Sequence, residues 1–412
     1  MRILHTSDWH LGRTLHGVDL VAHQAAFLDH LVEVVRRERV DAVLVAGDVY
    51  DRAIPPVAVV DLLDDVLLRL TEHTRVVLTP GNHDSATRLG FGAAMFRDRL
   101  AVRSRVEELA VPLELPAADG ASSALVYALP YLDPDTTRHR LAGPATDNAG
   151  APLVPARSHE AVAAAAMRRV RADLAARRAG GGPRVPAVLM AHAFVVGGAP
   201  SESERDIRVG GVDAVPLTVL TGPADGDSPG PDYLALGHLH GPQRVGPEPG
   251  PGRPGPVARY SGSPLAYSFS EMSHTKSSVL VELGPQGVTH VELVPTPCPR
   301  RLSEATGTLD ELLSPAFDRQ AEDWVRVAVT DTARPRDLYA RVKARFPHAL
   351  VVQHRPAAPL TGGPARAVTT AHDPLEVAAE FVQDVTGAAP TEAESAVLRR
   401  AYEAVLAAER SA

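Results

Sequence analysis

The sequence predicts an α/β protein, because short apolar strands alternate with amphipathic helices along its first hundred residues. Strands are expected at Arg2–Thr6, Val40–Ala46 and Arg75–Thr79. The run Val40–Ala46 is apolar without interruption, which is typical of a strand covered on both faces. Apolar residues recur at helical spacing in Val21–Arg37 and Val57–His73, so each segment is expected to form a helix with one buried side. Together these elements predict a layered architecture.

The middle of the chain continues the strand signal with longer connections. Apolar runs predict strands at Val185–Ala191, Tyr233–Leu236 and Val257–Ser261. Two further runs, Val279–Leu283 and Val288–Val294, flank a turn at Gly284–Gly287 and predict a hairpin. The α/β domain is therefore expected to extend to about residue 295.

A proline cluster at Pro295–Pro299 is suited to a domain boundary. After it, a strand, a helix and a second strand form a β-α-β unit over Trp324–Thr330, Pro335–Phe346 and Ala349–His354. Two helices, Pro374–Val385 and Thr391–Arg410, are expected near the end of the chain. We therefore expect a main domain over residues 1–295, a small α/β domain over residues 296–364 and C-terminal helices over residues 365–412.

Composition excludes several classes of protein. The 412 residues are 45% hydrophobic, with 42 basic and 50 acidic side chains and a net charge of −8, which is ordinary for a globular chain and unlike a disordered one. The single cysteine, Cys298, excludes an intrachain disulfide framework and a cysteine–zinc cluster. No apolar run is long enough for a membrane span, so we expect a cytoplasmic protein without a membrane partner.

Polar side chains follow five of the predicted strands, at the point where each strand ends. Ligands of α/β proteins bind beyond the carboxyl ends of such strands, so these side chains are expected to meet in one place. The candidates for this site are Asp8, His10, Asp48, Asn82, His83, Asp84, His192, His238 and His240. Gly47, Gly81 and Gly237 each precede one of them, as expected where the backbone must turn tightly beside a ligand.

The residue types indicate a metal centre. Imidazoles, carboxylates and one amide form a mixed nitrogen and oxygen set without a thiolate, which suits manganese, iron or zinc. The set exceeds the needs of one tetrahedral ion, so two ions bridged by a shared carboxylate are expected, about 3.5–4 Å apart. Two divalent ions outweigh the charges of Asp8 and Asp48, so an acidic chain can still attract a phosphate there.

The ordered set of these residues resembles the calcineurin-like metallophosphoesterases. Longer segments resemble one branch of that superfamily, the nuclease subunits of bacterial SbcCD exonucleases. These segments are Ile3–Gly12, Gly47–Arg52, Pro80–Ser85, Ser203–Arg205 with Val209–Gly211, and Tyr260–Pro264. The resemblance implies the metallophosphoesterase fold, with two β-sheets flanked by helices, and makes the small α/β domain a capping domain.

The resemblance also implies a role for each site residue. The first ion is assigned to Asp8, His10, Asp48 and His240, and the second to Asp48, Asn82, His192 and His238, with Asp48 bridging. His83 is expected to face the scissile phosphate as a catalytic residue, and Asp84 to orient its ring. Archaeal and eukaryotic relatives often carry histidine where this chain has Asp51, so no phosphate contact is assigned to Asp51.

The implied function is hydrolysis of DNA phosphodiester bonds with two divalent ions, most simply Mn2+. Family members act as double-strand exonucleases and as endonucleases on hairpins and single strands, in DNA repair and recombination. Their partner is an SMC-like ATPase, SbcC, and the nuclease subunit forms a homodimer within a heterotetramer. The two C-terminal helices are the candidate contact with that ATPase, the alternative being a helix pair that packs only on itself.

Two other functions remain open from the residues alone. A phosphatase or cyclic-nucleotide phosphodiesterase uses the same kind of two-metal centre, although it has no need of the C-terminal domain and helices. A binding scaffold that has lost its metals keeps the same fold, although every expected ligand is present here.

Overall fold

The computed structural model describes residues 1–96, 99–117, 120, 123–143, 152–208, 214–222, 230–247, 255–356, 373–386 and 389–409. The chain divides into two compact units. The first comprises Met1–Ser303 with Glu322–Trp324, and the second comprises Glu304–Ala321 with Val325–Ala412. Each unit is described by itself below.

The first unit contains two six-stranded sheets. One sheet has the strand order β16-β15-β1-β4-β5-β6, in which β1, β4, β5 and β6 are parallel and the hairpin β15–β16 adds an antiparallel edge. These strands are β1 (Arg2–Thr6), β4 (Ala42–Ala46), β5 (Arg75–Thr79), β6 (Leu100–Val102), β15 (Ser277–Gly284) and β16 (Gly287–Pro295).

The second sheet has the order β13-β14-β12-β9-β8-β7, with β14, β12, β9 and β8 parallel and an antiparallel strand at each edge. Its strands are β7 (Leu113–Pro116), β8 (Ser123–Ala128), β9 (Ala187–His192), β12 (Tyr233–Gly237), β13 (Gln243–Val245) and β14 (Val257–Tyr260). Both sheets therefore have parallel strands at their centre.

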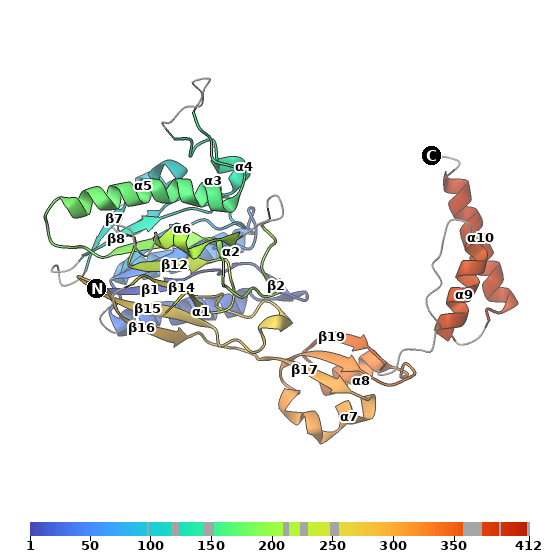
Figure 1. Ribbon diagram of the computed structural model, residues 1–412. Coiled ribbons are helices and arrows are strands. Elements are labelled where there is room, and N and C mark those ends of the chain that lie inside the picture. Colours follow the sequence, from blue (N-terminus) through green and yellow to red (C-terminus); the bar gives the residue numbers. More distant parts are fainter. Residues whose placement is uncertain are drawn as a thin grey trace. The chain divides into compact units, whose positions relative to one another are not determined.

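The two sheets pack face to face and helices cover both outer faces (Figure 1). Within β4, Ala42, Leu44 and Ala46 face the core between the sheets, whereas Val43 and Val45 face the helices α1 (Val21–Glu38) and α2 (Val57–His73). The helices α5 (His159–Ala179) and α6 (Leu217–Thr221) cover the other sheet. The period-two alternation of a strand explains why an uninterrupted apolar run is needed in this position.

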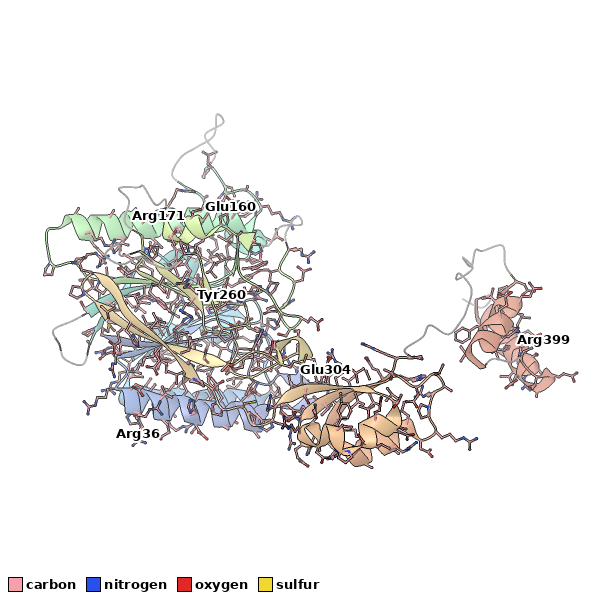
Figure 2. All side chains as sticks on the ribbon, turned by 60° about the horizontal axis from the view of Figure 1, so that its bottom comes forward. Arg36, Glu160, Arg171, Tyr260, Glu304 and Arg399 are labelled. Atoms are coloured by element: carbon pink, nitrogen blue, oxygen red, sulfur yellow. The ribbon has the colours of Figure 1, made fainter. Side chains whose placement is uncertain are left out.

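The side chains follow these layers (Figure 2). Tyr260 of β14 lies in the interior and is fully buried, while Arg36 of α1 and Glu160 of α5 project from opposite outer faces of the first unit. Short elements connect the layers: β2 (Thr14–Leu15), β3 (Val18–Asp19), α3 (Ala86–Leu89), η1 (Ala93–Met95), η2 (Val106–Glu108), α4 (Pro134–Thr137), β10 (Phe194–Val195), β11 (Ala214–Val215) and η3 (Phe269–Glu271).

The C-terminal part of the chain contains a three-stranded sheet of order β17-β18-β19 with its own apolar core. A capping box begins its first helix, because Thr308 and Glu311 each bind the other's backbone. Its elements are β17 (Leu302–Gly307), α7 (Leu309–Leu313), η4 (Pro315–Gln320), β18 (Trp324–Val329), α8 (Leu338–Arg345) and β19 (Ala349–His354). Two further helices, α9 (Pro374–Thr386) and α10 (Glu392–Glu409), contact each other.

The α/β class, the layers and most predicted strands and helices agree with the sequence analysis. Among the elements that the prediction did not include are the strands β6, β7, β8, β13 and β17 and the helices α5, α6 and α7. The division into residues 1–295, 296–364 and 365–412 stays a prediction, and its boundary at residues 364–365 lies outside the described residues. No described helix has the length and apolar character that a membrane span requires.

Candidate metal centre

The predicted site residues lie at the carboxyl ends of five parallel strands. Asp8 and His10 follow β1, Asp48 follows β4, and Asn82, His83 and Asp84 follow β5. In the facing sheet, His192 ends β9, and His238 and His240 follow β12. Strand ends of both sheets therefore supply one cluster, as the sequence predicts from the position of these residues after their strands.

The backbone at the cluster adopts conformations that few residues tolerate. Asp8, His10, Asp48 and His238 have positive φ angles of 54°, 45°, 50° and 107°. Residues with a Cβ rarely adopt such angles, and they concentrate at functional sites, where the surrounding structure holds them. The strand-to-loop turns are therefore fixed in conformations that direct these side chains toward one another.

The glycines beside the site allow close approach, as predicted. A Cβ at Gly81 would lie 2.2 Å from Asp48 Oδ1, and one at Gly47 would lie 2.3 Å from His192 Nδ1. Both distances are shorter than any tolerable contact, so a side chain at either position displaces a candidate ligand.

One group of candidate ligands contains Asp8, His10 and His240, whose ligand atoms all lie within 4.8 Å of one another. The Nε2 atoms of His10 and His240 are 3.0 Å apart, and His10 Nε2 lies 3.6 Å from Asp48 Oδ2. All four side chains are almost completely buried. These are the four residues assigned to the first ion.

The second group shares the Asp48 carboxylate. Asp48 Oδ2 lies 3.4 Å from His192 Nε2, and Asn82 Oδ1 lies 2.9 Å from His192 Nε2 and 3.2 Å from His238 Nδ1. One oxygen of Asp48 thus faces both groups. The four residues assigned to the second ion lie together, and Asp48 lies between the two groups.

This donor set fits divalent metal ions. The buried carboxylates and imidazoles converge with few hydrogen atoms to share between them, an arrangement that is costly without a cation. Burial raises the pKa of Asp8 to about 6 and lowers the pKa of His238 to about 3, so the His238 ring is neutral. Burial also opposes the charge on His192, but without a metal ion the carboxylates of Asp48 and Asp8 raise its pKa to about 9. Neutral imidazoles with free lone pairs are the form in which histidine binds a metal. The site is therefore a divalent metal site.

His83 is partly exposed, and one of its ring nitrogens lies within 4.8 Å of ligand atoms of His10 and Asp48. Its backbone N–H donates to Asp48 Oδ1 at 2.8 Å, and its ring Nδ1 donates to the carbonyl oxygen of Asp51 at 2.7 Å. The ring packs edge-on against His10, with 4.7 Å between centroids. Because Nδ1 is engaged with a carbonyl, Nε2 is the ring nitrogen that remains available.

The Asp84 carboxylate bonds to backbone groups in this structure, and its expected role in orienting the His83 ring stays a prediction. The Asp84 carboxylate accepts backbone N–H groups of Val49 at 3.0 Å, Tyr50 at 2.9 Å and Gly81 at 2.9 Å. Asp84 therefore fastens the loop after β5 to the loop after β4. Its influence on His83 is through these loops, since the ring hydrogen bond goes to Asp51.

Asp51 lies behind the first group of ligands. Its Oδ1 atom is 3.7 Å from His10 Nδ1 and 3.8 Å from Arg13 Nη1. The Arg13 guanidinium also stacks over the Tyr267 ring and donates to the carbonyl oxygen of Ser203. The Asp51 side chain is thus directed to a ligand histidine and to Arg13.

Sequence reasoning missed a set of polar residues behind His240, namely the buried Ser203, Glu271 and Lys276 and the partly buried Glu204. Glu271 and Lys276 have no special spacing, and a charged pair of this kind is usually solvated. The positions of Ser203 and Glu204 within a segment that resembles the family were the available signal.

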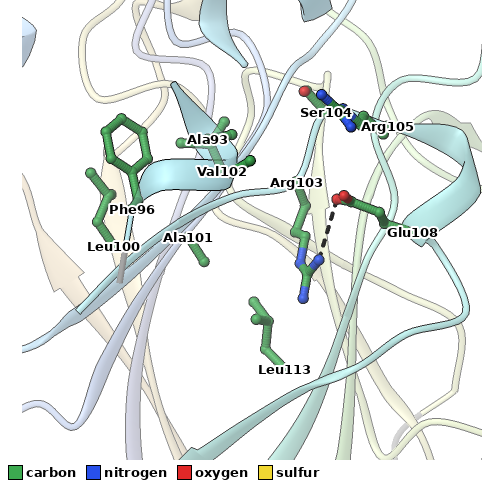
Figure 3. A pocket seen from close by; sticks show the side chains of 11 residues that line it. Ala93, Phe96, Leu100, Ala101, Val102, Arg103, Ser104, Arg105, Glu108 and Leu113 are labelled. Carbon is green, nitrogen blue, oxygen red and sulfur yellow. Dashed lines mark hydrogen bonds and ion pairs between the residues drawn. The ribbon is translucent and has the colours of Figure 1, made fainter. Parts of the chain in front are cut away.

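A separate cavity of about 340 Å³ lies between η1, β6 and η2 (Figure 3). Its lining includes Ala93, Phe96 and Leu100, and the charge of Arg103 is paired with Glu108 at 3.2 Å. None of the candidate metal ligands of the described residues lines this cavity; they lie at the strand ends instead.

Comparisons with known proteins agree with this site. Residues 1–125 match the calcineurin-like phosphoesterase family, and residues 298–386 match the family described as type 5 capsule protein repressor C-terminal domain. The SbcD protein of the SbcCD nuclease from Rhodobacter capsulatus is 36% identical over 337 residues, which cover 78% of this chain and 76% of the relative. The chain belongs to the SbcD family of SbcCD nuclease proteins.

Two other SbcD proteins show a similar extent of likeness. The Bacillus subtilis protein is 35% identical over 69% of this chain and 67% of its own length, and the Escherichia coli K12 protein is 29% identical over 84% and 82%. As a member of this family, the chain is a metal-dependent nuclease, a hydrolase of phosphodiester bonds.

Proposed function

We propose that this member of the SbcD family hydrolyses DNA phosphodiester bonds at a two-ion centre, as a double-strand exonuclease and as an endonuclease on hairpins and single strands. The single observation that carries the proposal is the pair of ligand groups that share Asp48 Oδ2, at 3.6 Å from His10 Nε2 and 3.4 Å from His192 Nε2. Two-ion centres of this kind serve phosphoester hydrolysis.

We assign the first ion to Asp8, His10, Asp48 and His240, and the second to Asp48, Asn82, His192 and His238. Bound divalent ions stabilise negative charge on a phosphate and make water acidic enough to attack at neutral pH. The nitrogen and oxygen donors suit manganese. The net acidic charge of the chain is offset locally, so DNA is a suitable substrate for this site.

The chain's own residues supply positioning and a proton. His83 is held at Nδ1 by the Asp51 carbonyl. As the imidazolium it also carries a proton on Nε2, which can be donated in a hydrogen bond to a phosphate oxygen or transferred to the departing sugar oxygen. Asp84 fixes the loop that carries His83 by accepting three backbone N–H groups. Arg13 lies next to the first ligand group and is our candidate for a contact with the DNA backbone.

A comparison of substrates tests the proposal. Purified protein with manganese is incubated with a linear DNA duplex, a DNA hairpin and a small aryl phosphodiester. Cleavage of the two DNA substrates supports the nuclease, whereas turnover of only the small ester supports the alternative, a phosphatase or cyclic-nucleotide phosphodiesterase.

We further propose that α9 and α10 bind an SMC-like ATPase, the SbcC component of the complex for which the relatives are named. The two helices contact each other but leave Phe381, Val385 and Val397 more than half exposed. An exposed apolar stripe on a helix pair is suited to a protein partner. In this account the complex acts in the cytoplasm on DNA ends, in repair and recombination.

We propose a homodimer through an apolar surface formed by α2, the segment before it and the segment after α3. Its exposed members are Ile54, Val57, Val60, Leu68, Phe91 and Met95. The two segments lie side by side, because Arg88 Nη1 donates to the Ala53 carbonyl oxygen at 3.1 Å. A second copy of this surface would remove these side chains from water.

A further inference from the structure

A buried ion pair lies directly behind His240. Lys276 Nζ is 2.5 Å from Glu271 Oε2, and the two residues are 9% and 1% exposed. Buried ion pairs are costly to desolvate, and apolar residues of the same size often stabilise a fold as well or better. The pair is therefore a candidate for a functional role.

Hydrogen bonds connect this pair to the His240 ring through Ser203. Ser203 Oγ lies 2.5 Å from His240 Nδ1 and also bonds the Glu271 carboxylate. A carboxylate can only accept, so the Ser203 hydroxyl donates to Glu271 and its oxygen accepts the N–H of His240 Nδ1. The proton on His240 is thereby fixed at Nδ1, which leaves the lone pair of Nε2 toward His10.

The backbone of His240 is held by the same residues and their neighbours. Its N–H donates to Glu204 Oε1 at 2.8 Å, and its carbonyl oxygen accepts from Lys276 Nζ at 2.8 Å. The buried Ser203–Glu271 pair therefore sets the tautomer and direction of the His240 ring, and Lys276 and the partly buried Glu204 hold its backbone.

We propose that Glu271 is a positioning residue for His240, acting through the Ser203 hydroxyl, with Lys276 as its counter-ion. This inference rests on the proposed function, in which His240 holds the first ion. A ligand histidine whose other ring nitrogen donates toward a carboxylate is a stronger and better oriented ligand. At the second ion the matching bond is weaker, because His192 Nδ1 donates to the Ala46 carbonyl oxygen at 3.0 Å.

The test is a manganese titration of the intact chain, in which isothermal titration calorimetry and the Mn2+ electron paramagnetic resonance signal measure the bound ions. Wild type is expected to bind two ions. In Ser203→Ala the affinity for one ion is expected to fall by roughly 10–100-fold, with the other unchanged. The matched control is Ser270→Ala. Ser270 Oγ accepts a hydrogen bond from the Glu202 N–H at 3.0 Å, next to the Ser203–Glu271 bond in the sequence, and has no contact with His240.

A double variant examines the charge itself. Glu271→Gln with Lys276→Met removes both buried charges together and keeps an acceptor for Ser203, and circular dichroism verifies its fold. We expect the affinity for the same ion to fall in this double variant as well. Unchanged affinity in Ser203→Ala overturns the inference, and unchanged affinity in the double variant overturns the role of Glu271. A wild-type chain that binds no manganese contradicts the proposed function itself.

Discussion

The Nε2 atoms of His10 and His240 lie 3.0 Å apart in the interior of the protein, although β1 and β12 belong to different sheets. Two ring nitrogens at this distance need a proton or a cation between them. Because Ser203 and Glu271 keep the His240 proton on Nδ1, the lone pair of His240 Nε2 is left for a proton of His10 or for a cation. The Asp8 carboxylate converges on the same place, which favours a cation. The predictions below follow from this arrangement.

Manganese is expected to stabilise the chain against heat. An ion that binds only the folded state adds about 2.7 kcal/mol to the free energy of unfolding at 100 times its dissociation constant. Differential scanning calorimetry should therefore show a Tm several degrees higher in manganese than in EDTA. In Asp48→Ala, which lacks the shared carboxylate, this difference should nearly vanish. An equal manganese effect in both proteins contradicts the ligand assignment.

His83→Gln is expected to lower the rate of DNA hydrolysis by roughly 10²–10⁴-fold, the usual contribution of a positioned proton donor. Glutamine keeps the size of the side chain but cannot supply a proton. Manganese stoichiometry should stay at the wild-type value, because neither ion is assigned to His83. Loss of manganese together with activity would reassign His83 to the structure of the site.

Asp84→Asn is expected to cost about 1–3 kcal/mol of stability, because an amide presents a donor to backbone N–H groups that need an acceptor. The loop that carries His83 loses its tie to Val49 and Tyr50, so activity should fall as well. Urea denaturation and the cleavage assay measure the two effects. The exposed residue Asp61 on α2 supplies the control, since Asp61→Asn should change neither.

The pH dependence of stability is expected to reflect His5. Burial lowers the pKa of His5 to about 3, and its Nδ1 lies 2.9 Å from the Tyr233 hydroxyl oxygen. Between pH 6.5 and 3 the unfolded chain binds a proton that folded His5 does not. The free energy of unfolding therefore falls as the pH falls, by about 2 kcal/mol from this residue between pH 6.5 and 5.

In His5→Gln the unfolded chain no longer binds this extra proton, because glutamine does not titrate. Urea unfolding in EDTA at pH 7 and pH 5 should show a smaller acid loss in the variant than in wild type. An identical acid loss in the two proteins shows that His5 takes up its proton normally in the folded state.

Phe381→Glu is expected to abolish binding of the SbcC ATPase, because it places a charge on the exposed apolar side of α9. Co-purification of the two proteins measures the binding. Glu380→Gln, at the neighbouring exposed position, is the control and should bind as wild type does. A full yield of complex with Phe381→Glu assigns the helix pair to another role.

The sequence predicts best those elements whose side chains all lie in the apolar core. β4 and β5 are buried on both faces, so each is an apolar run in the sequence. The end of each run marks the position of the candidate ligands that follow it. α5 was missed because arginines such as Arg168 and Arg169 interrupt an alanine-rich segment, which leaves little contrast between its sides. The role of Asp84 could not be read from the sequence, since its partners are backbone N–H groups of another loop.

The central claim is that two ions share Asp48. X-ray diffraction at the manganese absorption edge, on crystals grown with manganese, tests it most directly. The account predicts two anomalous peaks about 3.5–4 Å apart with the Asp48 carboxylate between them. A single peak, or two peaks that do not both contact Asp48, would contradict it.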